Sequence, residues 1–124
     1  PLPRAGSGLR AWSGEALDLG GRLGRVRGER ASGGIADAAW RNGPLRVGFR
    51  VPDLRCQPAG RRGSRDFKAL AQDCNLPPWL RDITPVLYIG ERVAAIANCC
   101  VCEPFVAGSD EPGWLIEWSV DHDR

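Results

Sequence analysis

A run of basic side chains lies in the middle of the 124-residue chain, in the fourteen positions from 55 to 68. Asp66 is the only carboxylate within this run. Guanidinium groups present forked N–H donors that match the oxygens of a phosphate. Pro58, Gly60 and Gly63 predict that the first part of the run is a loop. The run is therefore a candidate phosphate-binding loop, and a solvated basic loop above a core helix is the alternative. Its basic members are Arg55, Arg61, Arg62, Arg65 and Lys68.

The residues after this loop predict the helix that would position it, over 64–75. Apolar side chains recur there at the i, i+3, i+4, i+7 spacing of one helix face: Phe67, Leu70, Ala71 and Cys74. Ser64 is the predicted N-cap, with Asp66 in the first turn, and Asn75 the predicted left-handed residue at the end. Pro77 and Pro78 stop the helix and predict a short helical turn near 77–83. Free N–H groups at the start of such a helix would add to phosphate binding.

The rest of the chain predicts short strands. Residues 16–19 and 22–27 form a predicted hairpin around Gly20 and Gly21. Residues 45–51 alternate apolar and charged side chains, as a half-buried strand does. Residues 86–101 predict a hairpin that turns at Gly90 and Glu91, and its continuous apolar run indicates burial on both faces. The predicted fold class is α+β, a small β-rich domain of several short antiparallel strands with one main helix.

The two ends of the chain have different expected roles. Residues 1–14 are small and polar and predict a linker or lead-in segment, which leaves 15–124 as a single domain. The last strand, 114–120, places Trp114, Ile116, Trp118 and Val120 on one face. Such tryptophans could stack on bases, but strand spacing favours a role in the core. The first residue is not Met, which suggests a piece of a longer protein, and no secretion signal or membrane segment is visible, so we expect a cytoplasmic location.

Two further patterns have weaker chemical meaning. The five cysteines are an odd number without a secretion signal, and they contain no C-x-x-C pair, so we predict buried, reduced thiols and leave a metal site as the alternative. Residues 32–37, Ser-Gly-Gly-Ile-Ala-Asp, resemble a pyrophosphate-binding loop, but the aspartate falls one place late, and we predict a surface turn. The cysteines are Cys56, Cys74, Cys99, Cys100 and Cys102.

Charge is distributed unevenly along the chain. Residues 99–124 carry six carboxylates against Arg124, which gives this part a net charge of −5. Because the whole chain has a net charge of +2, residues 1–98 carry +7. This asymmetry suits a polyanionic partner that touches one face.

An independent enzyme is disfavoured, because the only histidine, His122, is near the end and no nucleophile–base pair is recognisable.

Several segments together resemble the C-terminal domain of bacterial tRNA(Ile)-lysidine synthetases, the TilS family. They are residues 45–50 (Leu-Arg-Val-Gly-Phe-Arg), 55–61 (Arg-Cys-Gln-Pro-Ala-Gly-Arg), 77–82 (Pro-Pro-Trp-Leu-Arg-Asp) and 112–115 (Pro-Gly-Trp-Leu), and the resemblance covers about 44–118. It implies a compact β-rich α+β fold, like a domain shared with phenylalanyl-tRNA synthetase. It also implies a parent enzyme that uses ATP and Mg²⁺ in an N-terminal catalytic domain to join lysine to the wobble cytidine of the AUA-reading isoleucine tRNA.

The resemblance leads us to expect a non-catalytic accessory domain without a cofactor of its own. Its expected partners are tRNA(Ile), around the acceptor stem, and the catalytic domain of the same protein, with a homodimer possible through the parent. A module that orients the catalytic domain or forms a dimer contact is the alternative. Arg81 is the least certain of the expected phosphate contacts, since it could pair with Asp82 or a carbonyl instead. The expected contacts are Arg55, Arg61, Arg62, Ser64, Arg65, Lys68 and Arg81.

Overall fold

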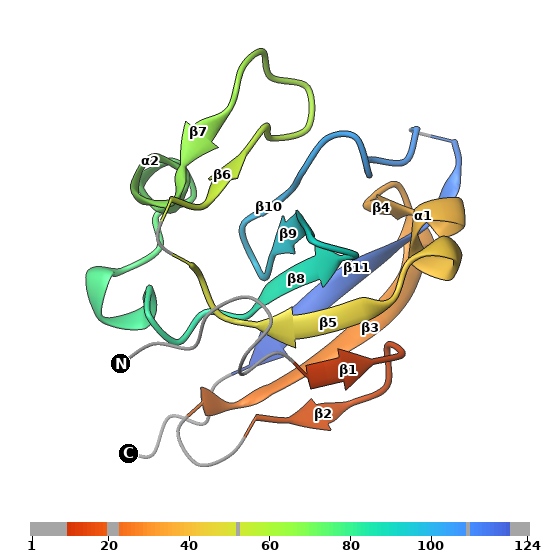
Figure 1. Cartoon of the computed structure of the whole chain (residues 1–124), viewed down its shortest axis with the longest axis horizontal. Helices are drawn as coiled ribbons and strands as arrows, with labels where there is room; N and C mark the ends of the chain where they lie inside the picture. Colours follow the sequence, from red (N-terminus) through yellow and green to blue (C-terminus); the bar gives the residue numbers. More distant parts are fainter. Residues whose placement is uncertain (1–9, 20–22, 52, 109, 120–124) are drawn as a thin grey trace.

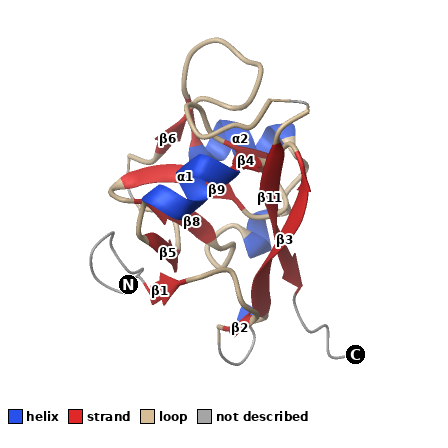
Figure 2. Cartoon of the chain, turned by 90° about the vertical axis from the view of Figure 1, so that its right-hand side faces the viewer, coloured by secondary structure: helices blue, strands red, loops and turns tan. Residues whose placement is uncertain are grey.

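The computed structural model describes residues 10–19, 23–51, 53–108 and 110–119, and it contains two antiparallel sheets (Figure 1). The first sheet has the order β1-β5-β8-β9-β10, with β1 at Arg10–Trp12, β5 at Leu45–Gly48, β8 at Val86–Ile89, β9 at Arg92–Ile96 and β10 at Cys100–Val101. The second has the order β2-β3-β11-β4, with β2 at Leu17–Asp18, β3 at Arg25–Ser32, β11 at Pro112–Ser119 and β4 at Ile35–Ala36. Figure 2 shows the long β3–β11 pair beside the shorter strands of the first sheet.

A third, two-stranded sheet forms an arm that projects from the rest of the fold (Figure 1). Strand β6 (Arg55–Cys56) pairs with β7 (Arg65–Asp66), and residues 57–64 connect them. We call residues 55–66 the basic arm. The helices are short: α1 at Asp37–Asn42, α2 at Phe67–Asp73 and the 3₁₀ turn η2 at Pro78–Leu80. The predicted class, a small and mostly antiparallel β domain with few helices, is confirmed.

The first sheet is buried on both faces, as the apolar run at 86–101 predicted. Leu87 and Ile89 of β8 pack toward the second sheet, and Val86 and Tyr88 pack toward α2 and the base of the basic arm. All four β8 residues are buried. The hairpin to β9 turns at Gly90, whose φ of 62° is in the left-handed region that glycine adopts without steric cost. The predicted second strand is interrupted, however, because a turn at 97–99 separates β9 from β10.

Tryptophans fill the space between the two sheets. Trp12 and Trp118 are 5% and 7% exposed. Trp40 of α1 stacks on Trp114 of β11 with ring centroids 4.7 Å apart, and Trp12 meets Trp40 edge-on at 5.5 Å. The indole N–H of Trp114 donates to Asp37 Oδ1 at 3.0 Å, and this bond is the main reason that the pKa of Asp37 is lowered. The core role predicted for Trp114 and Trp118 is therefore confirmed.

Three predictions need correction here. Residues 10–14 are not a linker, because Arg10–Trp12 pair with β5 and Trp12 is in the core; residues 1–9 lie outside the described part of the chain. Residues 32–37 are not only a surface turn. Gly33 and Gly34 do turn at positive φ, but β4 and α1 follow at once, with Ile35 fully buried. The strand predicted at 45–51 ends at Gly48, because the next residue across from it in the register is Pro85, which has no N–H to donate; the Phe49 carbonyl accepts a hydrogen bond from the Tyr88 hydroxyl.

The 16–27 hairpin is observed where the structure describes it, with Leu17 opposite Val26, while its turn at Gly20 and Gly21 lies outside the described residues. The last strand starts two residues earlier than predicted, and its predicted end at Val120 is also outside them.

Candidate nucleic-acid interface

Helix α2 begins two residues later than the sequence predicted, and its cap is Asp66 rather than Ser64. Asp66 Oδ1 accepts a hydrogen bond from the Ala69 N–H at 2.9 Å. The reason is β7: Arg65 and Asp66 pair with β6, so helical geometry cannot begin before Phe67. The predicted apolar face is confirmed in Phe67, Leu70 and Ala71, which are buried. A carboxylate at the cap places a negative charge at the start of α2, which opposes binding of a phosphate there.

The end of α2 follows the prediction closely. Asn75 has φ 59°, its N–H donates to the Gln72 carbonyl, and the Leu76 N–H donates to the Ala71 carbonyl. This pair of bonds is the Schellman motif, which satisfies the last carbonyls of a helix. Pro77 and Pro78 then lead into η2.

Arg81, the least certain of the expected phosphate contacts, has a structural role. Its Nε donates to the Leu76 carbonyl at 3.2 Å, which is the carbonyl contact considered as an alternative. Asp82 pairs with Arg50 at 2.6 Å rather than with Arg81. Arg81 is therefore the weakest of the seven candidates, because a phosphate would have to compete with this bond.

The basic arm has an ordered base and an open tip. Arg55 Nε donates to Ser64 Oγ at 2.9 Å, and a second Arg55 nitrogen donates to the Ser64 carbonyl at 3.0 Å. The two candidates thus lie together but bind each other, across the base of the arm. At the tip, Gly60 and Gly63 both have φ 75°, and a Cβ atom added to either would meet nothing within 4 Å, so the loop turns sharply and has open space around both glycines.

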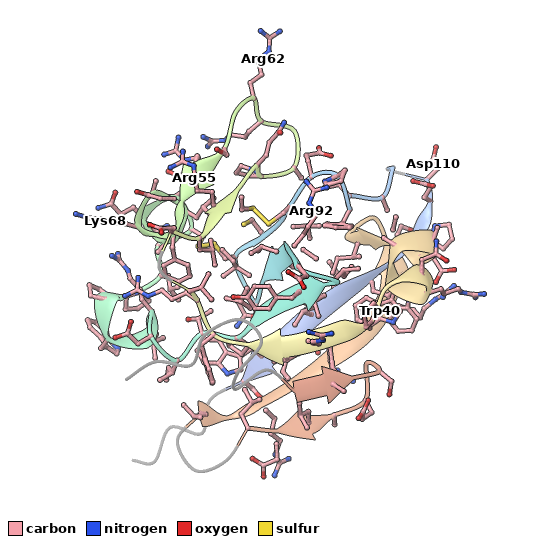
Figure 3. All side chains as sticks on the ribbon, in the orientation of Figure 1. Trp40, Arg55, Arg62, Lys68, Arg92 and Asp110 are labelled. Atoms are coloured by element: carbon pink, nitrogen blue, oxygen red, sulfur yellow. A yellow bond between two sulfur atoms is a disulfide. The ribbon has the colours of Figure 1, made fainter. Side chains whose placement is uncertain are left out.

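The remaining candidate residues differ in whether their charged groups are paired with a carboxylate. Arg65 Nε lies 3.0 Å from Asp73 Oδ2 and Arg61 lies 3.8 Å from the same oxygen. Arg65 Nε is buried and makes no aligned hydrogen bond, so its contact with Asp73 is an ion pair only. Arg62 extends from the tip in Figure 3, and Lys68 of α2 points outward on the same side of the molecule as Arg55. Within the described residues, Arg62 and Lys68 make no ion pair.

Two residues near this surface were not predicted from the sequence. Asp73 was not recognised as the counter-ion of the arm, because it follows the arginines at the far end of α2 and meets them only in the folded chain. Trp79, in η2, is 78% exposed, which is unusual for a tryptophan. The sequence shows that Trp79 follows two prolines and precedes Arg81, but nothing in it indicated whether the indole ring is exposed or buried.

The prediction of reduced thiols is contradicted by the structure. Cys56 is disulfide-bonded to Cys102, and Cys74 to Cys99, both with Cα atoms 5.5 Å apart. The spacing along the sequence concealed these pairs, because the fold places the arm and α2 against the segment 99–102. Cys100 is the free cysteine, half-buried, and burial raises the pKa of its thiol to about 11, so it is protonated near neutral pH. The disulfides join the base of the arm and the end of α2 to the first sheet.

A sequence model of the TilS substrate C-terminal domain matches residues 45–118. The chain belongs to this family. The match includes the basic arm, α2 and η2, so every candidate contact lies inside the part of the chain that defines the TilS C-terminal domain.

Relatives of known name agree with this assignment. The chain is 35% identical over 102 residues to a tRNA(Ile)-lysidine synthase of Coxiella burnetii and 36% identical over 112 residues to one of Methylococcus capsulatus. The alignments cover 82% and 88% of the chain but 23% and 25% of these relatives, so the chain spans about a quarter of their length. A crystal structure titled as a TilS C-terminal domain superposes with a TM-score of 0.66 at 18% identity, covering 88% of this chain and 92% of that one, which shows the same fold. In the described residues, no helix has the length and apolar character needed to cross a membrane.

Proposed function

We propose that this TilS C-terminal domain binds tRNA(Ile) as a non-catalytic part of a tRNA(Ile)-lysidine synthase. The observation that carries the proposal is the basic arm, a short hairpin whose tip carries the exposed Arg61 and Arg62, with Arg62 extending away from the core, while Lys68 is exposed on the outer side of α2. The names of the relatives supply the class of nucleic acid. In this proposal ATP, Mg²⁺ and the chemistry of lysine transfer belong to a catalytic domain of the longer protein.

The arm suits a double-stranded stem better than a set of unpaired bases. An RNA duplex has a deep, narrow major groove and a broad minor groove edged by phosphates and 2′-hydroxyls, which proteins recognise by backbone contacts. Flexible guanidinium and ammonium groups at the edge of a hairpin can reach such phosphates without reading base sequence. Contact with the acceptor stem follows from the family resemblance and is part of the proposal.

The side chains contribute in different ways. Arg61, Arg62 and Lys68 are exposed and make the direct contacts. Arg55 and Ser64 hold the base of the arm through their mutual hydrogen bonds, and Arg65 exchanges Asp73 for a phosphate. The start of α2 does not act as an anion site, because Asp66 occupies it.

The test is a titration of the chain with a tRNA(Ile) transcript at about 50 and about 200 mM salt, beside an Arg61→Ala/Arg62→Ala variant. Each lost phosphate contact lowers the slope of log K against log salt by about 0.7–0.9. The double variant should therefore have a slope smaller by about 1.4–1.8, and the wild-type chain should lose about tenfold more affinity than the variant across this range.

The matched control is Arg25→Ala/Arg41→Ala, which removes the same charge from exposed positions in β3 and α1. Its slope should stay close to that of the wild-type chain. Equal effects of the two double variants would show that only net charge matters and would refute the arm as the contact. If the wild-type chain ignores tRNA at low salt, the same double variant in the full-length synthase separates weak binding by the isolated domain from a module that only orients the catalytic domain.

A further inference from the structure

Three cysteine sulfur atoms meet where the basic arm joins the first sheet. Cys56 comes from β6, while Cys100 and Cys102 come from β10 and the residue after it. Their Sγ atoms all lie within 4.8 Å of one another, and Cys100 Sγ is 4.0 Å from Cys56 Sγ. Figure 3 shows a disulfide at the base of the arm, drawn in yellow. The site thus holds one more sulfur than a disulfide needs.

The backbone, rather than the disulfide alone, brings these sulfurs together. Cys100 and Cys102 are two positions apart in an extended segment, so their side chains point to the same face. A β-bridge joins Pro58 to Cys102, and the Ala59 N–H donates to the Val101 carbonyl at 3.0 Å. On the other side, the Cys102 N–H donates to the Ala94 carbonyl at 2.8 Å. Reduction of the disulfide would therefore leave the three thiols facing one another.

The arrangement is a compact triangle, which matters for its chemistry. Exchange of one disulfide for another requires the attacking sulfur to approach along the line of the bond being broken. Here the attacking sulfur would be Cys100 Sγ, which lies within 4.8 Å of both sulfurs of the Cys56–Cys102 bond and therefore stands beside this bond rather than on its line. A metal ion, in contrast, requires ligand atoms that surround one point, and Zn²⁺ bound to thiolates at about 2.3 Å places neighbouring sulfurs about 3.8 Å apart.

We propose that the reduced domain binds one Zn²⁺ through Cys56, Cys100 and Cys102. A dithiol reductant converts the Cys56–Cys102 disulfide into two thiols and is itself oxidised to a disulfide. Binding of Zn²⁺ then displaces three protons, one from each thiol, and forms three Zn–S bonds. Because Cys56 and Cys102 are buried and Cys100 is only half-buried, the open fourth position lies on the side of Cys100, where water can enter.

The ion would replace the disulfide as the link between the arm and the sheet. In the oxidised chain this link is covalent, and in the reduced chain the Zn²⁺ would join the same two segments and leave the arm in place. The second pair, Cys74 and Cys99, joins α2 to the turn before β10 and is not part of the triangle. Replacing this pair therefore controls for the general effect of removing two cysteines. Because the readout is Zn²⁺ binding, the result does not depend on whether the domain binds tRNA.

The experiment uses the chain reduced by a dithiol, with the reductant then removed under anaerobic conditions. Zn²⁺ is titrated in competition with a chromophoric chelator, and Co²⁺ is added in a parallel sample to observe thiolate-to-metal charge transfer. We expect one equivalent of Zn²⁺ per wild-type chain and a Co²⁺ spectrum of three thiolates. Cys100→Ser, which leaves the Cys56–Cys102 disulfide able to form, should bind at least tenfold more weakly and lose about a third of the charge-transfer intensity.

The control is Cys74→Ser/Cys99→Ser, which removes two cysteines and should bind Zn²⁺ as the wild-type chain does. Circular dichroism of each oxidised variant checks that it has folded. Wild-type binding no tighter than that of a Cys56→Ser/Cys100→Ser/Cys102→Ser variant would overturn the proposal. So would undiminished binding by Cys100→Ser, or loss of binding in the Cys74→Ser/Cys99→Ser control.

Discussion

Asp73 is the residue whose replacement tests the basic arm most directly, because it should strengthen binding rather than weaken it. Its Oδ2 lies 3.0 Å from Arg65 Nε and 3.8 Å from an Arg61 nitrogen, so a phosphate that binds these arginines competes with this carboxylate. The Asp73→Asn change keeps the shape of the side chain and removes the competing charge. The variant therefore frees two arginines of the arm without altering them.

The expected gain is small but measurable. The side chains of Arg61, Arg65 and Asp73 are 54%, 36% and 37% exposed, and ion pairs in such settings contribute about 0.2–1 kcal/mol each. After allowance for solvent screening, we expect tRNA(Ile) affinity at about 50 mM salt to rise about two- to fivefold, with a steeper salt dependence.

The stability of the fold should change little, because two effects oppose each other. The variant loses the ion pairs, but Asp73 is the last residue of α2, where a carboxylate is unfavourable with the helix dipole by about 0.3–1 kcal/mol. We therefore expect a change in the free energy of unfolding below about 1 kcal/mol in either direction. Urea denaturation of the oxidised chain measures it.

The control is Asp110→Asn, the same change of charge in the loop before β11, which Figure 3 shows far from the arm. It should leave tRNA affinity nearly unchanged. Weaker binding by Asp73→Asn, or gains of equal size in the two variants, would refute the idea that the arm arginines bind phosphate in competition with Asp73.

Three further predictions concern the framework of the domain. Asp66→Ala should lower the free energy of unfolding by about 1 kcal/mol through loss of the α2 cap, and Ser64→Ala by less; the reverse order in urea denaturation would restore the cap to Ser64. Gly113→Ala should cost about 3 kcal/mol or more, because its Cβ would lie 1.9 Å from the Gly33 carbonyl oxygen, whereas Gly60→Ala, which meets no neighbour but has φ 75°, should cost about 1–2 kcal/mol. Burial raises the pKa of Tyr88 from 10 to about 12, so its contribution to stability is complete below pH 10 and lost as pH rises through 12; unfolding of the wild-type chain should become easier over that range, and Tyr88→Phe should remove this component. Because Tyr88 is the only tyrosine, an absorbance titration reports its ionisation alone and should show a midpoint well above 10.

Local patterns predicted the elements whose limits are set by their own residues. The apolar spacing of Phe67, Leu70 and Ala71 found α2, and Asn75 before two prolines found its end, because both signals act within one turn of helix. The alternating and continuous apolar runs likewise found β5, β8 and β9. The basic run was correctly placed between the strand at 45–51 and the helix, but it was predicted as a loop, and the pairing of β6 with β7 was not foreseen.

Contacts between distant segments were the part that the sequence did not reveal. Ser64 has the chemistry of a cap, but the pairing of β7 with β6 moves the start of α2 to Phe67 and makes Asp66 the cap. The six residues of α1 are too few for a periodic pattern, and Trp40 keeps them in place by stacking on Trp114. The disulfide pairs and the Asp73 ion pairs depend in the same way on which segments the sheet brings together.

The contrast between the anchored base of the basic arm and its open tip bears on how this domain could be modified. Residues 60–63 lie between Ala59, whose N–H donates to the Val101 carbonyl, and Ser64, which accepts hydrogen bonds from Arg55, so the tip is bounded by fixed points. Closing a loop twice as long costs only about 0.6 kcal/mol more. The tip is therefore a replaceable cassette, into which longer loops or reporter peptides can be grafted while both cores and the α2 cap remain as they are.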